Sequence, residues 1–388
     1  MGVWNTFVEG DNLAVMQGLA PGSIDLVVTD PPYNTGSLFS YVDDFRGADG
    51  GRAGRHAAWV DFMRPRLEAM RAVLAPTGAL AISIDDNEQA RLRLLLDEVF
   101  GEHNFLAQVV VNLNPKGRQL GGGFATDHEY LLVYAREARS CLLDARTSDT
   151  VDPADFGLRT DDGRAYRRLP LRNTNKKFNP VTSPSLHFPV WGDPESGRVA
   201  TTPFEGAVEV LPVFGDGRPA VWRWSRPRID ERPDDLECRE IKGRQGARVD
   251  VFQRDWLESP GGRRKKLRTI WHSEEVGSTD TAVAELKQLV GHVFESPKPT
   301  GLVRRVLRTM PADARVLDPF AGSGTTGHAV ALLNAADGGS RTCLSVNVAE
   351  PVRPGSNADL AGLRTVADIT RARLRAVAEH VGGGLEER

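Results

Sequence analysis

The sequence predicts an α/β fold in which helices cover both faces of a doubly wound, mainly parallel sheet. Two observations carry this prediction. An apolar run at residues 24–28 leads directly into Asp30-Pro31-Pro32-Tyr33, and a second run at 315–317 leads into a glycine-rich segment at 320–327. Each has the form of a buried strand that ends in a loop, and a helix-like run follows the second loop.

Both ends of the chain supply the expected elements. Strands are expected, in order, at residues 4–8, 24–29, 79–84, 107–111, 130–134, 315–317 and 342–348. Helices are expected at 12–19, 61–74, 88–100, 302–309, 328–334 and 367–380, and a frayed tail from Gly382. Read circularly, the glycine-loop strand precedes the strand that ends at Asp30, so both loops would emerge at the carboxyl edge of one sheet.

The middle of the chain differs in composition from its ends. Residues 140–285 lack long helical periodicity and contain short apolar runs among Pro, Gly and Arg. We therefore expect an inserted, β-rich domain at 140–285, and one α/β domain assembled from 1–139 and 286–388. Basic clusters at 172–177, 222–226 and 263–268 could contact phosphates, although a solvated charged face is the alternative for each. Trp222 and Trp224 alternate along the chain and are expected in a core.

Composition restricts the function only weakly. The chain has 49 Lys and Arg against 52 Asp and Glu, so any affinity for nucleic acid must come from a local patch. Cys141, Cys238 and Cys343 are widely separated, which suits a reducing compartment and predicts no metal site. Neither a signal segment nor an apolar stretch of membrane-spanning length occurs, so a cytoplasmic protein without a membrane partner is expected.

The segment from Asp30 to Tyr33 has the chemistry to hold an amino group. An acidic side chain and a prolyl carbonyl at a strand end can both accept hydrogen bonds from one amine. The ring of Tyr33 offers a face on which a flat heterocycle can stack. A simple turn is the alternative, because Asp and Pro are common turn residues.

The glycine loop has several interpretations. Gly322, Gly324 and Gly327 match G-x-G-x-x-G, and Glu350 follows the next strand, where a ribose-binding acid belongs. A nicotinamide-dependent dehydrogenase is therefore an alternative. Its position argues against it, because only 61 residues follow Gly327 (388 − 327), room for about one further β/α unit. A phosphate-binding P-loop is disfavoured because His328 stands where its lysine should follow the last glycine.

Together the two motifs resemble those of the amino-group DNA methyltransferases, which use S-adenosylmethionine and carry D-P-P-Y and F-x-G-x-G. The order, with the Asp30 motif first and a long insertion before the glycine loop, is similar to the β-class modification (Mod) subunits of type III restriction-modification systems. Further similar segments lie at 10–13, 34–36, 83–86, 128–130, 297–299 and 350–351. The resemblance implies a circularly permuted, Rossmann-like S-adenosylmethionine-dependent methyltransferase fold with an inserted target-recognition domain.

The resemblance also assigns roles to individual residues. The catalytic residues would be Asp30, Pro31, Pro32 and Tyr33. Asp30 and the carbonyl of Pro31 would accept the two hydrogens of a flipped base's amine, while Tyr33 stacks on the base. The residues that bind S-adenosylmethionine would be Asp11, Lys298, Asp318, Phe320, Gly322, Gly324 and Glu350.

Alternatives remain for several of these residues. Asp11 could cap the helix expected at 12–19, Glu350 could simply end a strand, and Phe320 could contribute packing alone. Two acidic segments, Asp85-Asp86 and Asp127-His128-Glu129, are interpreted as structural. Asp86 is placed to cap the next helix, and His128 has no second metal ligand nearby.

The expected function is site-specific methylation of the N6 amine of adenine in double-stranded DNA, in a restriction-modification or related phage defence system. The alternatives are methylation of the N4 amine of cytosine, a DNA-recognition subunit of a larger defence complex and, least favoured, the dehydrogenase. The resemblance also allows a homodimer and a restriction or helicase-nuclease partner subunit. The chain is shorter than typical Mod subunits, so the alternatives include a compact recognition insertion, a stand-alone enzyme and a member of another defence system.

Overall fold

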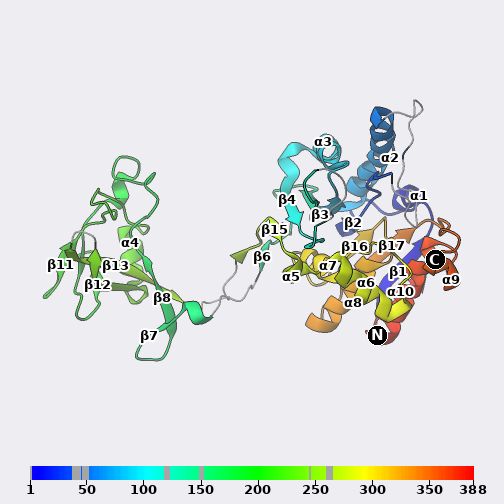
Figure 1. Cartoon of the computed structure of the whole chain (residues 1–388). Helices are drawn as coiled ribbons and strands as arrows, with labels where there is room; N and C mark the ends of the chain where they lie inside the picture. Colours follow the sequence, from blue (N-terminus) through cyan, green and yellow to red (C-terminus); the bar gives the residue numbers. More distant parts are fainter. Residues whose placement is uncertain are drawn as a thin grey trace. The chain divides into compact units, whose positions relative to one another are not determined.

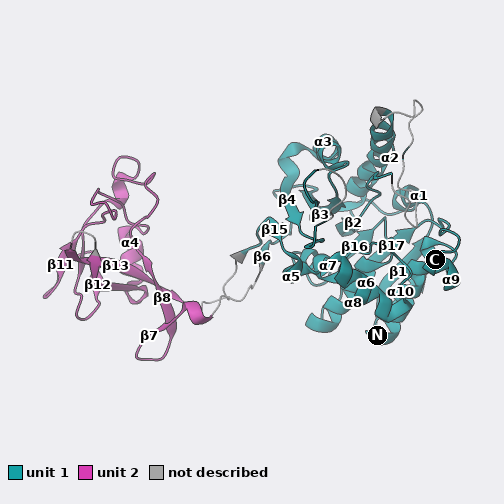
Figure 2. Cartoon of the chain, in the orientation of Figure 1, with its two compact units in different colours: residues 1–147, 266–388 teal, residues 148–265 magenta. Residues whose placement is uncertain are grey.

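A computed structural model describes residues 2–36, 45, 52–117, 123–147, 153–243, 246–258 and 265–388. The chain divides into two compact units, one formed by residues 1–147 with 266–388 and the other by 148–265 (Figure 2). The second unit is shorter at both ends than the insertion expected at 140–285. Residues 266–285 lie in the first unit because β15 (Ile270–Trp271) joins its sheet beside β4 (Phe105–Val111).

The first unit is built on one mixed sheet of nine strands in the order β15-β4-β5-β3-β2-β16-β17-β1-β18 (Figure 1). β5 is antiparallel to both of its neighbours, and every other pair in this sheet is parallel. The expected α/β architecture is therefore confirmed, with strands from both ends of the chain. The remaining strands are β1 (Val3–Glu9), β2 (Ile24–Thr29), β3 (Leu74–Ile84), β5 (Glu129–Ala135), β16 (Arg315–Asp318), β17 (Thr342–Asn347) and β18 (Gly384–Glu387).

The central strand β2 is buried on both faces. Leu26 and Val28 pack in a cluster with residues of α7 (Thr300–Leu307) and α8 (Thr325–Asp337). Val27 packs in a second cluster with residues of α1 (Asn12–Gln17), α2 (Arg52–Val73) and α3 (Gln89–Phe100). A strand enclosed in this way has an almost continuous apolar sequence, which is the pattern that identified it.

Two further helices belong to the first unit. These are α6 (Thr279–Val290) and α10 (Val366–His380), which contact each other. α6 begins inside the range that was expected to lack helices. The shorter elements of this unit are η1 (Glu102–Asn104), α5 (Ser273–Val276), α9 (Asn357–Leu360) and β6 (Arg146–Thr147), which pairs with β14 (Lys265–Lys266).

The expectation of a frayed tail from Gly382 is wrong. The last residues form β18, which pairs with β1 in parallel register. The guanidinium of Arg375 donates two hydrogen bonds to Glu387, at 2.6 and 2.8 Å. Main-chain pairing and this bidentate ion pair fix the tail at the edge of the sheet.

The second unit contains two antiparallel sheets. One has the order β12-β13-β8-β7, and the other is β10-β9-β11. Trp222 and Trp224 lie in the core of this unit with 0% and 3% of their surface exposed, as the sequence predicted. The elements of this unit are η2 (Pro153–Asp155), β7 (Leu158–Arg159), β8 (Ala165–Pro170), η3 (Pro184–Leu186), β9 (Val190–Gly192), β10 (Val199–Ala200), β11 (Val208–Val210), α4 (Arg226–Glu231), η4 (Pro233–Asp235), β12 (Leu236–Gly243) and β13 (Gly246–Trp256).

Within the described ranges, none of the helices is both long enough and apolar enough to cross a membrane.

Candidate active site

The two loops singled out in the sequence begin side by side. β2 and β16 are hydrogen-bonded parallel neighbours, with Leu26 opposite Val316 and Val27 opposite Leu317. From β2 the sheet continues to β3, and from β16 it continues to β17 on the opposite side. Such a switch in direction leaves a crevice at the carboxyl ends of the strands, where α/β proteins bind ligands.

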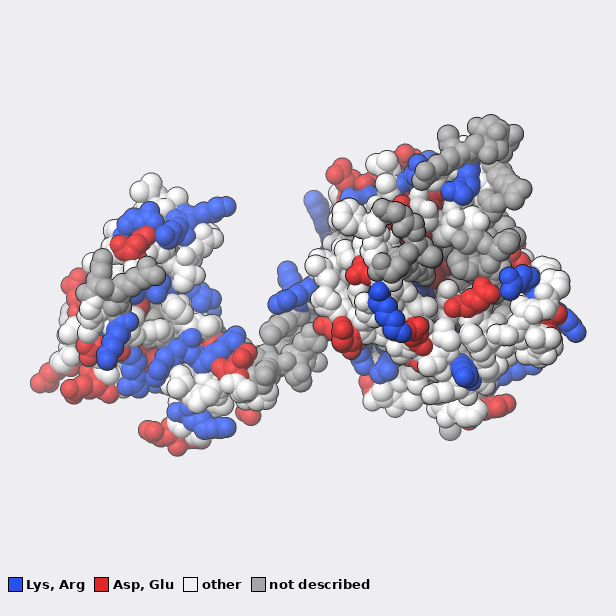
Figure 3. Space-filling model, in the orientation of Figure 1, with Lys and Arg blue, Asp and Glu red and all other residues white. Residues whose placement is uncertain are grey.

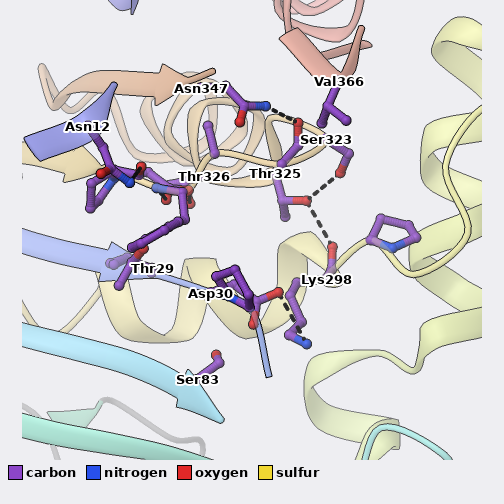
Figure 4. Close-up of a pocket in the computed structure, with 18 of the residues that line it drawn as sticks. Asn12, Thr29, Asp30, Ser83, Lys298, Ser323, Thr325, Thr326, Asn347 and Val366 are labelled. Atoms are coloured by element: carbon purple, nitrogen blue, oxygen red, sulfur yellow. Dashed lines mark hydrogen bonds and ion pairs between the residues drawn. The ribbon is translucent and has the colours of Figure 1, made fainter. Parts of the chain in front are cut away.

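A cavity of about 330 Å³ lies at this position (Figure 4). Its size falls within the range of small-molecule sites, roughly 300–1,000 Å³. Of the residues predicted for the site, its lining contains Asp11, Asp30, Pro32, Lys298, Asp318, Phe320, Gly322 and Glu350. The lining does not contain Pro31, Tyr33 or Gly324.

Asp30 belongs to a compact group of four polar side chains. The hydroxyl of Tyr33 donates to Oδ1 of Asp30 at 2.6 Å and lies 3.0 Å from Oε2 of Glu129. The ammonium of Lys298 lies 3.3 Å from Oδ2 of Asp30 and donates to Oε2 of Glu129 at 2.8 Å. Figure 4 shows Asp30 and Lys298 pointing toward one another at the edge of the cavity. Two carboxylates therefore share one ammonium and one phenol.

Burial and charge act in opposite directions within this group. Burial raises the pKa of Asp30, and the positive charge of Lys298 limits that rise. Burial also raises the pKa of Tyr33 well above its usual value, so the phenol keeps its proton and can donate. For Lys298, burial would lower the pKa, but the two carboxylates outweigh burial and raise it. Lys298 is therefore a fixed cation beside Asp30.

The segment after Asp30 is held by buried hydrogen bonds. The indole of Trp59 donates to the carbonyl of Pro32 at 2.7 Å. Asn34 has a left-handed backbone (φ 58°), and its amide donates to Oε1 of Glu88 at 2.6 Å. Glu88 is fully buried and also contacts Nδ1 of His56. This network fixes the backbone at the end of β2.

Each glycine of the G-x-G-x-x-G segment has its own structural reason. Gly322 and Gly324 have positive φ angles of 52° and 79°, which residues with a Cβ seldom adopt. Gly322 lines the cavity, and its carbonyl accepts from the hydroxyl of Thr370 at 2.6 Å. Gly324 caps α8 outside the lining. At Gly327 a Cβ would lie 2.6 Å from Cδ2 of Leu374.

Asp318 ends β16 and is almost completely buried. Burial raises its pKa to about 7, although the hydroxyl of Thr326 donates to it at 2.5 Å and the amide of Phe320 at 3.2 Å. Behind the loop, the buried guanidinium of Arg373 donates to the hydroxyls of Ser323 and Thr325, at 3.0 and 2.8 Å. Ser323 and Thr325 line the cavity, so a buried cation supports this wall.

Asp11 has the structural role that the sequence left open for it. It caps α1 by accepting from the amide of Ala14 at 3.0 Å. Its other oxygen accepts from Arg66 at 3.2 Å, and Arg66 in turn lies 3.7 Å above the ring of Phe62. Phe62 packs at a tilt against Phe320, with ring centroids 6.1 Å apart. Because Asp11, Arg66, Phe62 and Phe320 all line the cavity, capping does not remove Asp11 from it.

The lining suits a ligand that carries positive charge and several hydroxyl or amino groups. Among the described residues, it contains four carboxylates and two cations, Arg66 and Lys298. Carboxylates accept hydrogen bonds from hydroxyls and amines and attract a cation. Apolar side chains complete the wall, among them Val28, Phe294 and Leu302. This donor set fits S-adenosylmethionine, which combines a sulfonium, a ribose and an adenine amine.

Two sequence interpretations need correction. Glu129 was assigned a structural role, but it contacts both Tyr33 and Lys298. Asp86 does not cap α3, which begins after Glu88 with no side-chain cap; instead Asp86 accepts from the hydroxyl of Tyr130. The similarity of the segment at 128–130 to Mod subunits was the feature of the sequence that could have indicated a role for Glu129 at the site.

Other polar groups at or behind the wall of the cavity could not be predicted from the sequence. Arg66 and Arg373 lie within ordinary helical sequence, in α2 and α10. Asn347, at the end of β17, donates to the carbonyl of Gly322 at 3.1 Å. Among the residues that the structure describes, no cluster of three or more His, Cys, Asp or Glu could hold a metal ion.

Comparison with known proteins identifies a family and relatives. The family described as DNA methylase (N6_N4_Mtase) matches residues 24–336. The type II methyltransferase M.KpnI of Klebsiella pneumoniae is 34% identical, over 96% of this chain and 87% of its own length. The EcoPI Mod subunit of a type III restriction-modification enzyme from Escherichia phage P1 is also 34% identical, over 96% of this chain but only 62% of that subunit. Among solved structures, PvuII DNA methyltransferase (cytosine-N4-specific) is 13% identical over 100% of this chain and 96% of its own, with a TM-score of 0.45.

Proposed function

The chain belongs to the DNA methylase family, and we propose that it transfers a methyl group to the N6 amine of adenine at specific sites in double-stranded DNA. The methyl donor is S-adenosylmethionine, the cofactor of this class of enzyme. One observation carries the proposal: Asp30 and the loop around Gly322 line the same cavity from adjacent strand ends. A carboxylate that can accept a hydrogen bond from the target amine therefore lies in the same cavity as the loop that would bind the cofactor.

S-adenosylmethionine supplies a methyl group already activated by its sulfonium, so the protein needs neither a nucleophile nor a metal for the transfer. The task of the chain is to hold the amine in line and to stabilise the positive charge that grows on its nitrogen. Asp30 would accept one amine hydrogen and the carbonyl of Pro31 the other. The hydrogen bond from Tyr33 to Oδ1 and the ion pair with Lys298 support the charged form of Asp30 and fix its orientation.

The cofactor would lie along the glycine loop. Gly322 permits close approach of the backbone, and Glu350 and Asp11 supply carboxylates for the ribose hydroxyls and the adenine amine. Lys298 would act chiefly on Asp30, because its ammonium already pairs with two carboxylates. Gly324 would contribute indirectly, as the cap of α8. The expected stacking of Tyr33 on the base stays a prediction.

Reaching the amine of adenine requires the base to leave the duplex. Enzymes that modify a base inside DNA flip it into a pocket, at a cost of a few kcal/mol for unstacking. We assign target recognition to the unit formed by 148–265, whose described residues are all absent from the lining of the cavity. The order β3-β2-β16-β17-β1 fits a circularly permuted methyltransferase sheet, with β16 as its natural first strand.

The biological setting that we propose is restriction-modification. Two relatives are named as a type II methyltransferase and as the Mod subunit of a type III restriction-modification enzyme. By analogy, the chain would protect host DNA and would act either alone or with a restriction subunit. A homodimer would let one copy contact the recognition sequence while the other copy modifies the base.

Methylation of the N4 amine of cytosine is the second candidate. The acceptor geometry around Asp30 suits any exocyclic amine on a base, so it does not distinguish the two targets. The relation to Mod subunits favours adenine.

The test uses DNA from a methylation-free bacterial host that expresses the chain, its Asp30→Ala variant or an Asp61→Ala control, which removes an exposed carboxylate on α2. Digestion to nucleosides, followed by sequencing that reports modified bases, should show N6-methyladenine in one sequence context. The modification should disappear with Asp30→Ala and persist with Asp61→Ala. Detection of N4-methylcytosine would show that the target is cytosine and not adenine. If the chain binds S-adenosylmethionine but the DNA contains no modified base, free DNA is not its substrate.

A further inference from the structure

One face of the four-stranded sheet in the second unit carries an unusual concentration of arginine. Alternate residues of β13 point to this face, including Arg248, Asp250 and Arg254. Their neighbours across the sheet continue the pattern: Arg254 is paired with Arg168 of β8, and Asp250 with Arg239 of β12. The opposite face packs into the core of the unit through Val251, Cys238 and Leu171.

The arginines surround two carboxylates. Glu237, with 0% of its side chain exposed, accepts from Nε of Arg168 and lies 3.6 Å from Arg254 and 4.0 Å from Arg239. Asp250 lies 3.2 Å from both Arg172 and Arg248. Among the residues that the structure describes, these contacts join five guanidinium groups to two carboxylates, so this cluster has three more positive than negative charges (5 − 2).

This excess is not what a purely structural ion-pair network requires. Each guanidinium has five N–H donors, so a single carboxylate cannot accept hydrogen bonds from all the donors of three guanidinium groups. The side chains of Arg168 and Arg239 remain 36% and 40% exposed, although Glu237 between them is completely buried. Like charges held close together repel, and a polyanion at the surface would relieve that repulsion.

Aromatic side chains help to fix the orientation of the arginines. Tyr166 donates its hydroxyl to Glu237 at 2.9 Å and packs against Trp256, with ring centroids 5.4 Å apart. The guanidinium of Arg254 lies over the rings of Tyr166 and Trp256, 5.6 and 6.0 Å from their centroids. Cation–π contacts and a shared buried carboxylate hold the guanidinium groups in place before a ligand arrives, which lowers the entropic cost of binding.

We propose that this face, formed by Arg168, Arg172, Arg239, Arg248 and Arg254 around Glu237, binds the phosphate backbone of duplex DNA. The inference rests on the proposed function, because a DNA methyltransferase must hold a duplex while it modifies a base. Phosphates match both the planar donor geometry of arginine and the positive excess. Figure 3 shows many Lys and Arg side chains on the unit that contains this sheet.

The face differs from the basic clusters that the sequence suggested. In those clusters Lys176 pairs with Asp216, and Arg226 lies over the ring of Phe188. Residues 263 and 264 lie outside the described part of the chain. Of the five arginines, only Arg172 belongs to a predicted cluster; sheet register brings the others together.

The first test measures binding of a short labelled DNA duplex by fluorescence anisotropy over a range of salt concentrations. The Arg168→Gln/Arg239→Gln double variant removes the two most exposed of the three arginines around Glu237. Each lost phosphate contact should reduce the slope of log K against log salt by about 0.9, so the double variant should lose roughly two units of slope and at least tenfold in affinity at low salt. The matched control is Arg146→Gln/Arg218→Gln, which removes the same charge from two exposed arginines that each pair with an aspartate outside this face and should leave the slope close to that of the wild type.

A second measurement needs no variant and therefore cannot fail through misfolding. Phenylglyoxal modification of the wild-type protein, read by mass spectrometry, should label Arg168 and Arg239 in the free protein and much less when duplex DNA is bound. Arg218 should be labelled equally in both states. Equal labelling of Arg168 and Arg239 with and without DNA, or an unchanged salt slope in a folded double variant, would overturn the inference. Protection by an acidic protein but not by DNA would overturn it in favour of a protein partner. Failure of the proposed function is distinguishable, because the wild type would then neither bind nor methylate DNA.

Discussion

The ammonium of Lys298 donates to the carboxylate of Glu129 at 2.8 Å, across 169 positions of sequence. The same ammonium lies 3.3 Å from Asp30, whose pKa is raised by burial and lowered by Lys298. If the carboxylate form of Asp30 is the active one, activity falls as the pH drops through its pKa. Lys298→Met removes the positive charge and raises that pKa further. The acid limb of the pH–rate profile should therefore move to higher pH, measured as kcat with DNA and S-adenosylmethionine saturating.

Glu129→Gln should act in the opposite direction. The negative charge of Glu129 raises the pKa of Asp30, so its removal lowers that pKa and moves the acid limb to lower pH. The hydrogen bond from Tyr33 to Asp30 remains in this variant. Lys298→Arg, which keeps the charge, serves as the control for both. Shifts of the same sign in Lys298→Met and Glu129→Gln would contradict this account of the group.

Glu129 also shows what the sequence could and could not predict. The runs at 24–28 and 315–317 are nearly continuous apolar segments because their strands are buried on both faces, so their position and the loops that follow could be predicted locally. Glu129 instead reaches the site because β5 pairs antiparallel with β3, placing Tyr130 opposite Ile84. No local pattern specifies that register, and the same holds for the arginines that β8, β12 and β13 bring together.

Asp318 should make cofactor binding depend on pH. Burial raises its pKa to about 7, and it lines the cavity. The sulfonium of S-adenosylmethionine favours the carboxylate form, whereas the neutral thioether of S-adenosylhomocysteine does not. Affinity for S-adenosylmethionine should rise by up to about tenfold between pH 6 and 8, with a much smaller change for S-adenosylhomocysteine, since one pKa unit corresponds to a tenfold change. Calorimetry at several pH values measures both, and Asp318→Asn should remove the difference between the two ligands. A difference that persists in Asp318→Asn would assign the effect to another group, such as Asp30.

Asn34 allows backbone strain to be separated from hydrogen bonding. Its left-handed φ of 58° suits Gly better than Ala, and its side chain donates to the buried Glu88. Asn34→Gly and Asn34→Ala both lose this donor, at about 1–3 kcal/mol. Asn34→Ala should lose roughly 1–2 kcal/mol more, because a Cβ is strained in this region. Chemical denaturation gives the free energy of unfolding of each variant. Equal stability of the two variants would mean that the backbone relaxes out of the left-handed conformation.

Gly327 is expected to be required for packing and Gly322 for the ligand. A Cβ on residue 327 would lie 2.6 Å from Cδ2 of Leu374 and 2.7 Å from Oδ1 of Asn5, so Gly327→Ala should destabilise the fold by about 1–3 kcal/mol. Its affinity for S-adenosylmethionine, measured below the unfolding transition, should stay close to that of the wild type.

Gly322→Ala has space around the new Cβ but a positive φ of 52° in the wall of the cavity, so it should weaken cofactor binding by more than it lowers stability. Gly123→Ala, which meets nothing within 4 Å, is the control for both. If Gly327 acts through Leu374, Gly327→Ala should destabilise less in a Leu374→Ala background than in the wild type, because the second substitution removes the clashing atom. An undiminished effect in that background would assign the clash to Asn5 instead.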